Sequence, residues 1–180
     1  MRQRADRRTS RPEDRLQSGK RSSSLYTAEE RRRRDASRWT FVQGVLAPLQ
    51  FAVFLVSLAL VLRFLATGDG FAAATASIVV KTFVLYTIMV TGSIWEKEVF
   101  GVYLFARPFF WEDVFSIAVL ALHTAYLAAL LTAALTPVQQ MWLALAAYAA
   151  YLINAGQFLW KLRLARKEAE NTLVGAGAGA

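Results

Sequence analysis

The chain has 180 residues, of which 56% are hydrophobic, and it carries a formal net charge of +8. Most Lys and Arg residues lie before Trp39 or after Trp160, so the pattern indicates a membrane protein with basic ends and not a basic globular domain. The absence of cysteine excludes disulfide bonds, thiolate catalysis and cysteine-ligated metals.

Residues 1–24 are rich in Arg, Ser, Asp and Gln and have too little apolar surface to fold alone. We expect a disordered basic tail on the cytoplasmic side, where anionic membrane lipid attracts it. No recognition motif for nucleic acid is present, so no nucleic-acid partner is expected. Thr27, followed three residues later by Glu30, has the spacing of a capping box and predicts a short surface helix.

Four apolar segments follow, each with roughly the 20 residues needed to cross a bilayer. The expected spans are residues 41–62, 72–94, 114–135 and 138–159. The sequence therefore predicts an all-α membrane protein, a bundle of four transmembrane helices over residues 25–167, with a flexible tail over 168–180.

The connections between the spans are also predictable. "TGDG" (67–70) is a turn between the first two spans. In "TPVQ" (136–139), Thr136 has the position of an N-cap, Pro137 of the first helical residue and Gln139 of the third. The last two spans should therefore form a tight hairpin.

Lys and Arg residues give the orientation, because they favour the cytoplasmic side. They are frequent before the first span and in "KLRLARK" after the fourth, whereas the 136–139 turn has none. We therefore expect the N- and C-termini and the segment Gly92–Ser116 in the cytoplasm. The tryptophans support this orientation. Tryptophan prefers the membrane–water interface, and four of the five lie at the predicted cytoplasmic ends of the spans, namely Trp39, Trp95, Trp111 and Trp160.

The segment Gly92–Ser116 places acidic residues among aromatic ones. Its carboxyl groups belong to Glu96, Glu98, Glu112 and Asp113. Acids at a helix N-terminus are favourable, which offers a structural reading of Glu112 and Asp113. Apolar surroundings favour the protonated form of a carboxyl group, so such groups can also donate a proton to a flat hydrophobic substrate.

Two ionisable residues, Lys81 and His123, lie near span centres, where charge is costly and a functional role is a default hypothesis. Lys81 has a structural alternative, an interhelical pairing. His123 is either a satisfied core histidine or an axial ligand for a metal-centred macrocycle. Helical periodicity predicts three inward-facing polar stripes, namely Gln43 with Gln50; Asn154 with Gln157 and Lys161; and Glu112 with Ser116, Val119 and His123. The residues alone thus predict a small membrane enzyme or pigment-binding protein with acid–base capacity.

The sequence also carries a family resemblance. The run "WTFVQGVLAPLQFAVFLVSLALVLRFLATGDGFAAATASIVVKTFVLYTIMVTGSIWEKEVFG" continues into "FFWEDVFSIAVLALHTAYLAALL" and "AAYLINAGQFLWKLR". Together these stretches resemble the 2-vinyl (3-vinyl) bacteriochlorophyllide hydratase family of anoxygenic phototrophic bacteria. The resemblance covers roughly residues 25–167.

The resemblance implies a hydro-lyase of bacteriochlorophyll a biosynthesis in the bacterial inner, or photosynthetic intracytoplasmic, membrane. Water would add to the 3-vinyl group of chlorophyllide a or 3-vinyl bacteriochlorophyllide a and give a 3-(1-hydroxyethyl) group. The expected partners are this tetrapyrrole substrate, membrane lipid and, as open options, other pathway enzymes or a second copy of the chain. No cofactor or protein metal site is expected, because magnesium is carried by the substrate.

The resemblance assigns no catalytic residues, so the assignments rest on chemistry. We predict Glu112, Asp113 and Glu96 as the acid–base groups. For substrate binding we predict His123 and Trp111, with Lys97 and Arg107 as partners of the anionic propionate; Lys161 and Arg163 are alternatives for that role.

Two other functions remain open at this point. One is a non-enzymatic tetrapyrrole carrier or haem protein with His123 as ligand. The other is a small proton-coupled transporter that uses Lys81 and His123; the acidic cluster at one interface disfavours it, because transport sites lie near the membrane midplane.

Overall fold

The computed structural model describes residues 25–177, and side chains as far as residue 167. The tail expected over 1–24 lies outside the described residues. Within residues 25–177 the chain is helical and has no strands. The elements are α2 (Ala28–Ala36), α3 (Arg38–Thr67), α4 (Phe71–Phe100), the 3₁₀ turn η1 (Arg107–Phe109), α5 (Phe110–Thr132) and α6 (Pro137–Gly177).

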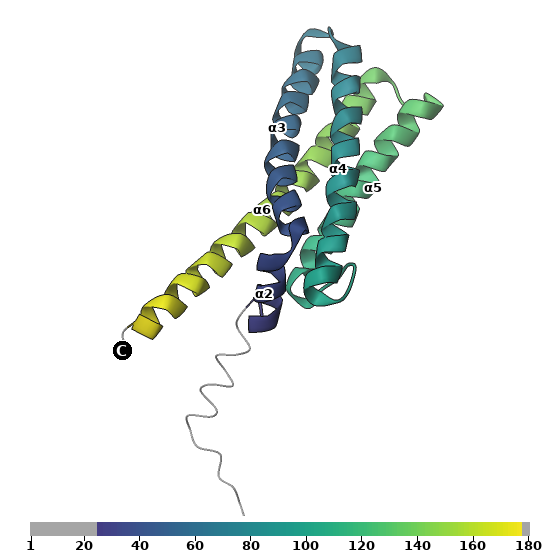
Figure 1. Cartoon of the computed structure of the whole chain (residues 1–180). Coiled ribbons are helices and arrows are strands. Elements are labelled where there is room, and N and C mark those ends of the chain that lie inside the picture. Colours follow the sequence, from purple (N-terminus) through teal and green to yellow (C-terminus); the bar gives the residue numbers. More distant parts are fainter. Residues whose placement is uncertain (1–24, 178–180) are drawn as a thin grey trace, which may run out of the picture.

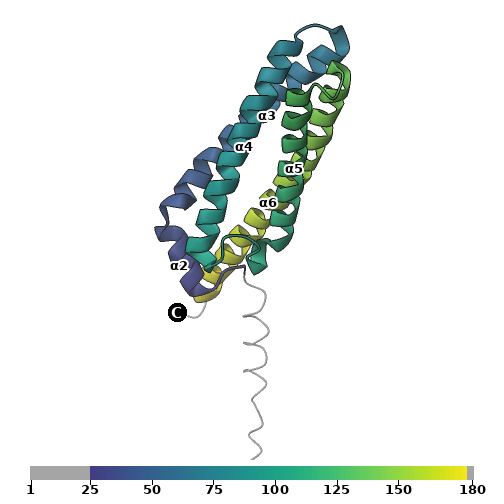
Figure 2. The ribbon, with the colours of Figure 1, turned by 90° about the vertical axis from the view of Figure 1, so that its right-hand side faces the viewer.

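Four of these helices are long and apolar enough to cross a membrane, as the sequence predicts. Figures 1 and 2 show α3 and α4 as one antiparallel hairpin and α5 and α6 as a second, with the two hairpins packed into a bundle. Large apolar side chains cover the outside: Phe41 is 76% exposed and Leu131 is 85% exposed. Such an apolar surface needs lipid around it.

The predicted turns and caps are confirmed. Gly68 and Gly70 adopt positive φ values of 79° and 88° between α3 and α4, a conformation that suits glycine. At the start of α6, the Thr136 backbone N–H donates to Gln139 Oε1 at 3.0 Å. The capping box of α2 is also present, with the Thr27 N–H donating to Glu30 Oε2 at 2.7 Å.

The helices are longer than the expected spans. α4 has 30 residues, which is roughly 45 Å at about 1.5 Å per residue and exceeds the roughly 30 Å hydrocarbon core. Glu96 and Glu98 therefore lie on the last turns of α4 and not in a connecting segment, because good helix formers continue past the apolar window. α6 likewise continues to Gly177, so its backbone is helical through most of the segment expected as a flexible tail.

The buried core runs along the bundle interior, where aromatic and aliphatic side chains of all four long helices meet. Its largest fully buried apolar members are Phe54, Val61, Ile78, Val119, Tyr126, Met141 and Tyr148. A second, smaller cluster lies at the end where α2 meets α4; we call it the aromatic cluster, and it consists of Tyr26, Trp95, Phe100, Phe109 and Phe158.

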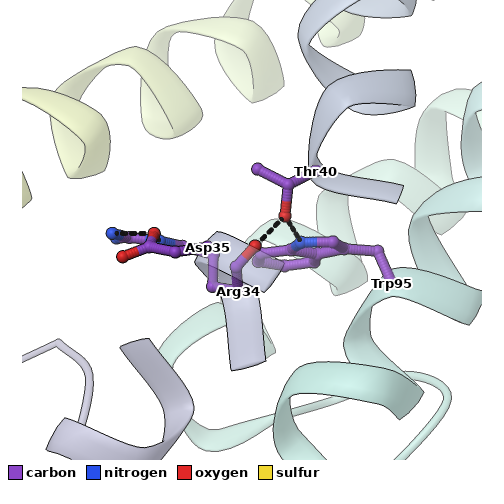
Figure 3. Close-up of polar contacts among 4 residues, drawn as sticks. All are labelled: Arg34, Asp35, Thr40 and Trp95. Carbon is purple, nitrogen blue, oxygen red and sulfur yellow. Dashed lines mark hydrogen bonds and ion pairs between the residues drawn. The ribbon is translucent and has the colours of Figure 1, made fainter. Parts of the chain in front are cut away.

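Hydrogen bonds fix the junction of α2 and α3 against the end of α4. Figure 3 shows the Thr40 hydroxyl donating to the backbone carbonyl of Arg34 at 2.6 Å and accepting from Trp95 Nε1 at 2.9 Å. Nearby, the Ser37 hydroxyl donates to Glu98 Oε2 at 2.8 Å. α2 and the aromatic cluster thus close the same end of the bundle as the connection between α4 and α5.

Candidate functional site

The connection between α4 and α5 is short and brings the acidic residues together. Gly101 ends α4 with a φ of 84°, and only residues 101–106 separate that helix from η1. The chain reverses direction here, so the last turns of α4 lie beside the first turn of α5. Six of the seven residues that the sequence predicts as site members therefore share one end of the bundle: Glu96, Lys97, Arg107, Trp111, Glu112 and Asp113.

Glu96 on α4 and Asp113 on α5 form a buried carboxyl pair. Two consecutive backbone amides, those of residues 105 and 106, hold their carboxyl groups next to each other, and the two residues are 5% and 3% exposed. Two adjacent carboxylates repel each other, so burial side by side favours the state in which one of the two holds a proton. The pair is therefore one proton donor and one proton acceptor side by side.

The backbone of the connection covers this carboxyl pair. The Phe105 N–H donates to Asp113 Oδ2 at 2.6 Å, and the Ala106 N–H donates to Glu96 Oε2 at 3.2 Å. Phe105 has a φ of 62°, a strained value for a residue with a side chain that costs about 1–3 kcal/mol. The bond from the Phe105 N–H to Asp113 offsets part of this strain.

Glu112 lies beside the pair but has its own partner. Its carboxylate accepts a hydrogen bond from Lys161 Nζ on α6, which also donates to the carbonyl of Pro108. The Glu112 side chain is 6% exposed and that of Lys161 is 23% exposed. Lys161, one of the cations proposed for the substrate propionate, is thus engaged with the protein itself and ties α6 to the start of α5.

Aromatic rings surround the acids on two sides. The aromatic cluster packs beneath them, with Lys161 Nζ 5.1 Å from the ring centroid of Phe109. On the outside, Phe105 and Phe110 have ring centroids 5.5 Å apart, and Phe110 and Trp111 are also 5.5 Å apart. These last three residues, which we call the aromatic shelf, are 42%, 44% and 65% exposed.

The two cations predicted to bind an anion differ in their surroundings. Lys97 Nζ donates to the carbonyl of Gly101 at 2.8 Å and faces the Tyr103 ring, so it closes the end of α4. Arg107 is exposed and forms no hydrogen bond or ion pair with another described residue. Arg107 is therefore free to bind an anionic group.

Lys81 and His123 meet in the bundle interior, and each is 0% exposed. The His123 Nδ1–H donates to the carbonyl of Val119 at 2.8 Å, so Nε2 carries the lone pair and accepts from Lys81 Nζ at 2.9 Å. Tyr148 and Tyr151 face the ammonium group, with ring centroids 4.9 and 4.4 Å away. His123 follows Asp113 by ten residues on α5, roughly 15 Å deeper along the helix.

Sequence reasoning missed the backbone amides of Phe105 and Ala106, because a hydrogen bond from the main chain leaves no side-chain signal. It also missed that Lys161 is the partner of Glu112, although Lys161 lies on the predicted inward stripe of α6 with Asn154. The Asn154 bond to Ser116, at 2.8 Å, confirms that this stripe faces α5.

Four membrane-length helices and a buried carboxyl pair beside exposed aromatic rings define a small helical membrane protein with acidic groups gathered at one end. Over residues 26–164 it matches one family, and the chain belongs to the 2-vinyl bacteriochlorophyllide hydratase family.

Two curated relatives extend this finding. A 2-vinyl bacteriochlorophyllide hydratase of Cereibacter sphaeroides is 71% identical over 146 residues, which is 81% of this chain and 91% of that protein. A protein of the same name from Rhodobacter capsulatus is 66% identical over 152 residues, 84% of this chain and 88% of that protein. No solved structure matches the chain significantly.

Proposed function

We propose that this protein is a hydro-lyase that adds water to the vinyl group of a chlorophyllide-type macrocycle and produces a 1-hydroxyethyl group for bacteriochlorophyll synthesis. The observation that carries the mechanism is the buried pair of adjacent carboxyl groups, Glu96 and Asp113, because hydration needs one group that gives a proton and one that takes a proton. Family membership supplies the substrate class.

In the proposed reaction Glu96 gives its proton to the terminal vinyl carbon. Positive charge then develops on the carbon next to the macrocycle, where the ring system delocalises it and the neighbouring carboxylates stabilise it. Water attacks that carbon, and Asp113 accepts the proton that the water loses. The vinyl group has gained one hydrogen atom and one hydroxyl group, and no electrons have been transferred. We therefore propose no redox cofactor; magnesium belongs to the substrate.

The aromatic shelf and Arg107 are the proposed binding surface. Phe105, Phe110 and Trp111 offer flat, exposed rings on which a flat macrocycle can stack. Arg107 offers an unpaired guanidinium for the propionate. Because Glu96 and Asp113 lie beneath the backbone of residues 105 and 106, the vinyl group reaches them only when the connection between α4 and α5 shifts.

The other predicted residues take different places in this proposal. Glu112, bonded to Lys161, contributes charge near the developing cation and holds the start of α5. His123 is too deep to touch a pigment on the shelf, and its Nε2 is occupied by Lys81. Because Nε2 is occupied, the alternative function of a haem or pigment carrier with His123 as axial ligand is also disfavoured.

The proposed reaction predicts incorporation of oxygen from water. Protein in membranes, incubated with 3-vinyl substrate in water labelled with ¹⁸O, should give a 1-hydroxyethyl pigment that gains one ¹⁸O atom, read by mass spectrometry. Membranes from cells that lack the protein are the control. Tight pigment binding without label would show carriage and contradict hydration.

We also propose that both termini face the cytoplasm, in the bacterial inner membrane or its photosynthetic invaginations. Four spans put α2 and the C-terminal end of α6 on one side, together with the connection at residues 101–106. The basic residues on that side support the assignment. We propose lipid contact along the whole outer face; an association with pathway enzymes or a second copy stays open to direct test.

The topology predicts opposite labelling of two single-cysteine variants. The chain has no cysteine, so Asp69→Cys and Val102→Cys each introduce the only thiol. In intact cells an impermeant thiol reagent should label residue 69, and in opened membranes it should label both. Val102 is preferred to Gly101, whose positive φ disfavours a side chain. Labelling of residue 102 alone in intact cells would reverse the assignment.

A further inference from the structure

Besides Gln140 near the start of α6, three amide side chains in the part of the bundle nearer the carboxyl pair have buried polar atoms without a hydrogen-bonding partner. They are Gln50 on α3, through both Nε2 and Oε1, Asn154 through Oδ1, and Gln157 through Oε1. Gln50 is 1% exposed and Asn154 is 8% exposed. A buried polar atom that lacks a partner is costly, and proteins commonly satisfy such atoms with an internal water molecule.

The helix register brings Gln50 and Asn154 to one level and places Gln157 about one turn nearer the carboxyl pair; we call these three residues the amide layer. The rings of Phe54 on α3 and Tyr151 on α6 are 5.0 Å apart. Gln50 precedes Phe54 by four residues and Asn154 follows Tyr151 by three. Because α3 and α6 run in opposite directions, both amides lie one turn from this contact toward the carboxyl pair.

The amide layer is also one helical turn from the carboxyl pair. Asn154 Nδ2 donates to Ser116 Oγ at 2.8 Å, and Ser116 follows Asp113 by three residues on α5. Gln157 lies one turn before Lys161, which binds Glu112. The layer therefore lies between the carboxyl pair and the deeper pair of Lys81 and His123.

We propose that the amide layer binds internal water and is the source of the water molecule that adds to the vinyl group, an inference that rests on the proposed function. The unpartnered atoms are three carbonyl oxygens and one NH₂ group. A water molecule donates two hydrogen bonds and accepts two, so it matches this set. The three carbonyl oxygens carry partial negative charge and would repel an anion. A cation is also disfavoured, because the layer has no carboxylate to compensate its charge.

The chemistry of hydration explains why amides suit this place. Carbonyl oxygens accept the O–H bonds of water and leave a lone pair on its oxygen for the carbocation. Amides neither donate a proton to water nor remove one at neutral pH, so the acid–base step stays with Glu96 and Asp113. Because the backbone of residues 105 and 106 covers the carboxyl pair, water held on the interior side of the pair can reach the vinyl group while the pigment approaches from the aromatic shelf.

Solid-state NMR on the isotope-labelled full chain in lipid bilayers tests the water site without any substrate. Magnetisation transferred from water should reach the side-chain amide of Gln50 within milliseconds, although this residue is buried. The hydroxyl groups of Ser57 and Tyr148, which bond each other deeper in the bundle, should stay dry and serve as the internal control. A Gln50 amide that receives no more signal than they do overturns the proposal.

Kinetics test the supply of water. Gln50→Leu replaces the amide by an apolar side chain of similar size and so removes its hydrogen-bonding groups. This variant should slow ¹⁸O incorporation at saturating pigment at least about tenfold, with unchanged pigment affinity. Gln43→Leu, two turns away on the same face of α3, is the matched control and should keep the wild-type rate. A normal rate in Gln50→Leu overturns the proposal. If the wild type incorporates no ¹⁸O, the proposed function fails, whereas the NMR result still decides the water site.

Discussion

Replacing Glu96 by Gln, or Asp113 by Asn, is expected to slow hydration at saturating substrate at least about 100-fold, because general acid–base groups contribute about 10²–10⁴-fold in rate. Each amide keeps the shape of the acid it replaces. The Glu96→Gln variant cannot give a proton to the vinyl carbon, and the Asp113→Asn variant cannot take one from water. The measurement is single-turnover conversion of the vinyl pigment, with protein abundance and pigment binding measured on the same membranes.

The matched control for this experiment is Glu98→Gln. Glu98 lies two residues after Glu96 on α4, is exposed, and accepts a hydrogen bond from Ser37 that a glutamine oxygen can also accept. This variant should keep the wild-type rate. Normal rates in both Glu96→Gln and Asp113→Asn would show that the carboxyl pair is structural and would move the search for the proton donor elsewhere.

The shared proton also predicts the shape of the pH profile. At low pH both carboxyl groups are protonated, so Asp113 cannot accept a proton from water. At high pH both are ionised, so Glu96 cannot donate. The rate should therefore fall on both sides of one optimum, and each variant should lose one limb of the profile. A profile that is flat across the range in which the protein stays folded would contradict the assignment.

Much of the fold could be predicted from the sequence, because local chemistry decides it. Gly68 and Gly70 permit the backbone of the first turn, and Thr136 with Gln139 starts α6. Apolar runs of membrane length gave the four spans. The ends of the helices were less predictable, because a helix continues beyond the hydrocarbon wherever its residues favour it, as α4 does through Glu96.

The site could be predicted only as a set of residue types near one membrane interface. Which carboxyl pairs with which partner depends on how α4, α5 and α6 rotate against one another, and no local pattern fixes that rotation. Glu112 and Asp113 are adjacent in sequence, yet one binds Lys161 and the other lies against Glu96. Lys81 and His123 were both singled out as buried ionisable groups, but their contact requires the same long-range packing.

The largest effect on stability is expected from Lys161→Met. Methionine keeps much of the length and the apolar stem of lysine but removes the charge that Glu112 needs. Breaking a buried ion pair by removing one partner costs about 3–5 kcal/mol, because the remaining charge is buried without compensation. We expect a loss of about 3 kcal/mol, the lower end, since the Lys161 side chain is 23% exposed.

A second substitution separates this cause from lost packing. In the double variant Lys161→Met with Glu112→Gln, residue 112 carries no charge that needs a partner, so most of the lost stability should return. Glu112→Gln alone should cost less than Lys161→Met, because Lys161 keeps the Pro108 carbonyl and some access to water. Reversible unfolding in mixed detergent, followed by circular dichroism, measures the free energy of unfolding for the set.

The same variants test whether Glu112 is needed for chemistry. If its carboxylate serves chiefly to hold α5 against α6, the Glu112→Gln protein that remains folded should turn over at a rate far above that of Glu96→Gln. A 100-fold loss in folded Glu112→Gln would place this residue among the proton-transferring groups instead. No recovery of stability in the double variant would show that Lys161 acts through packing and its bond to Pro108, and not through the buried charge of Glu112.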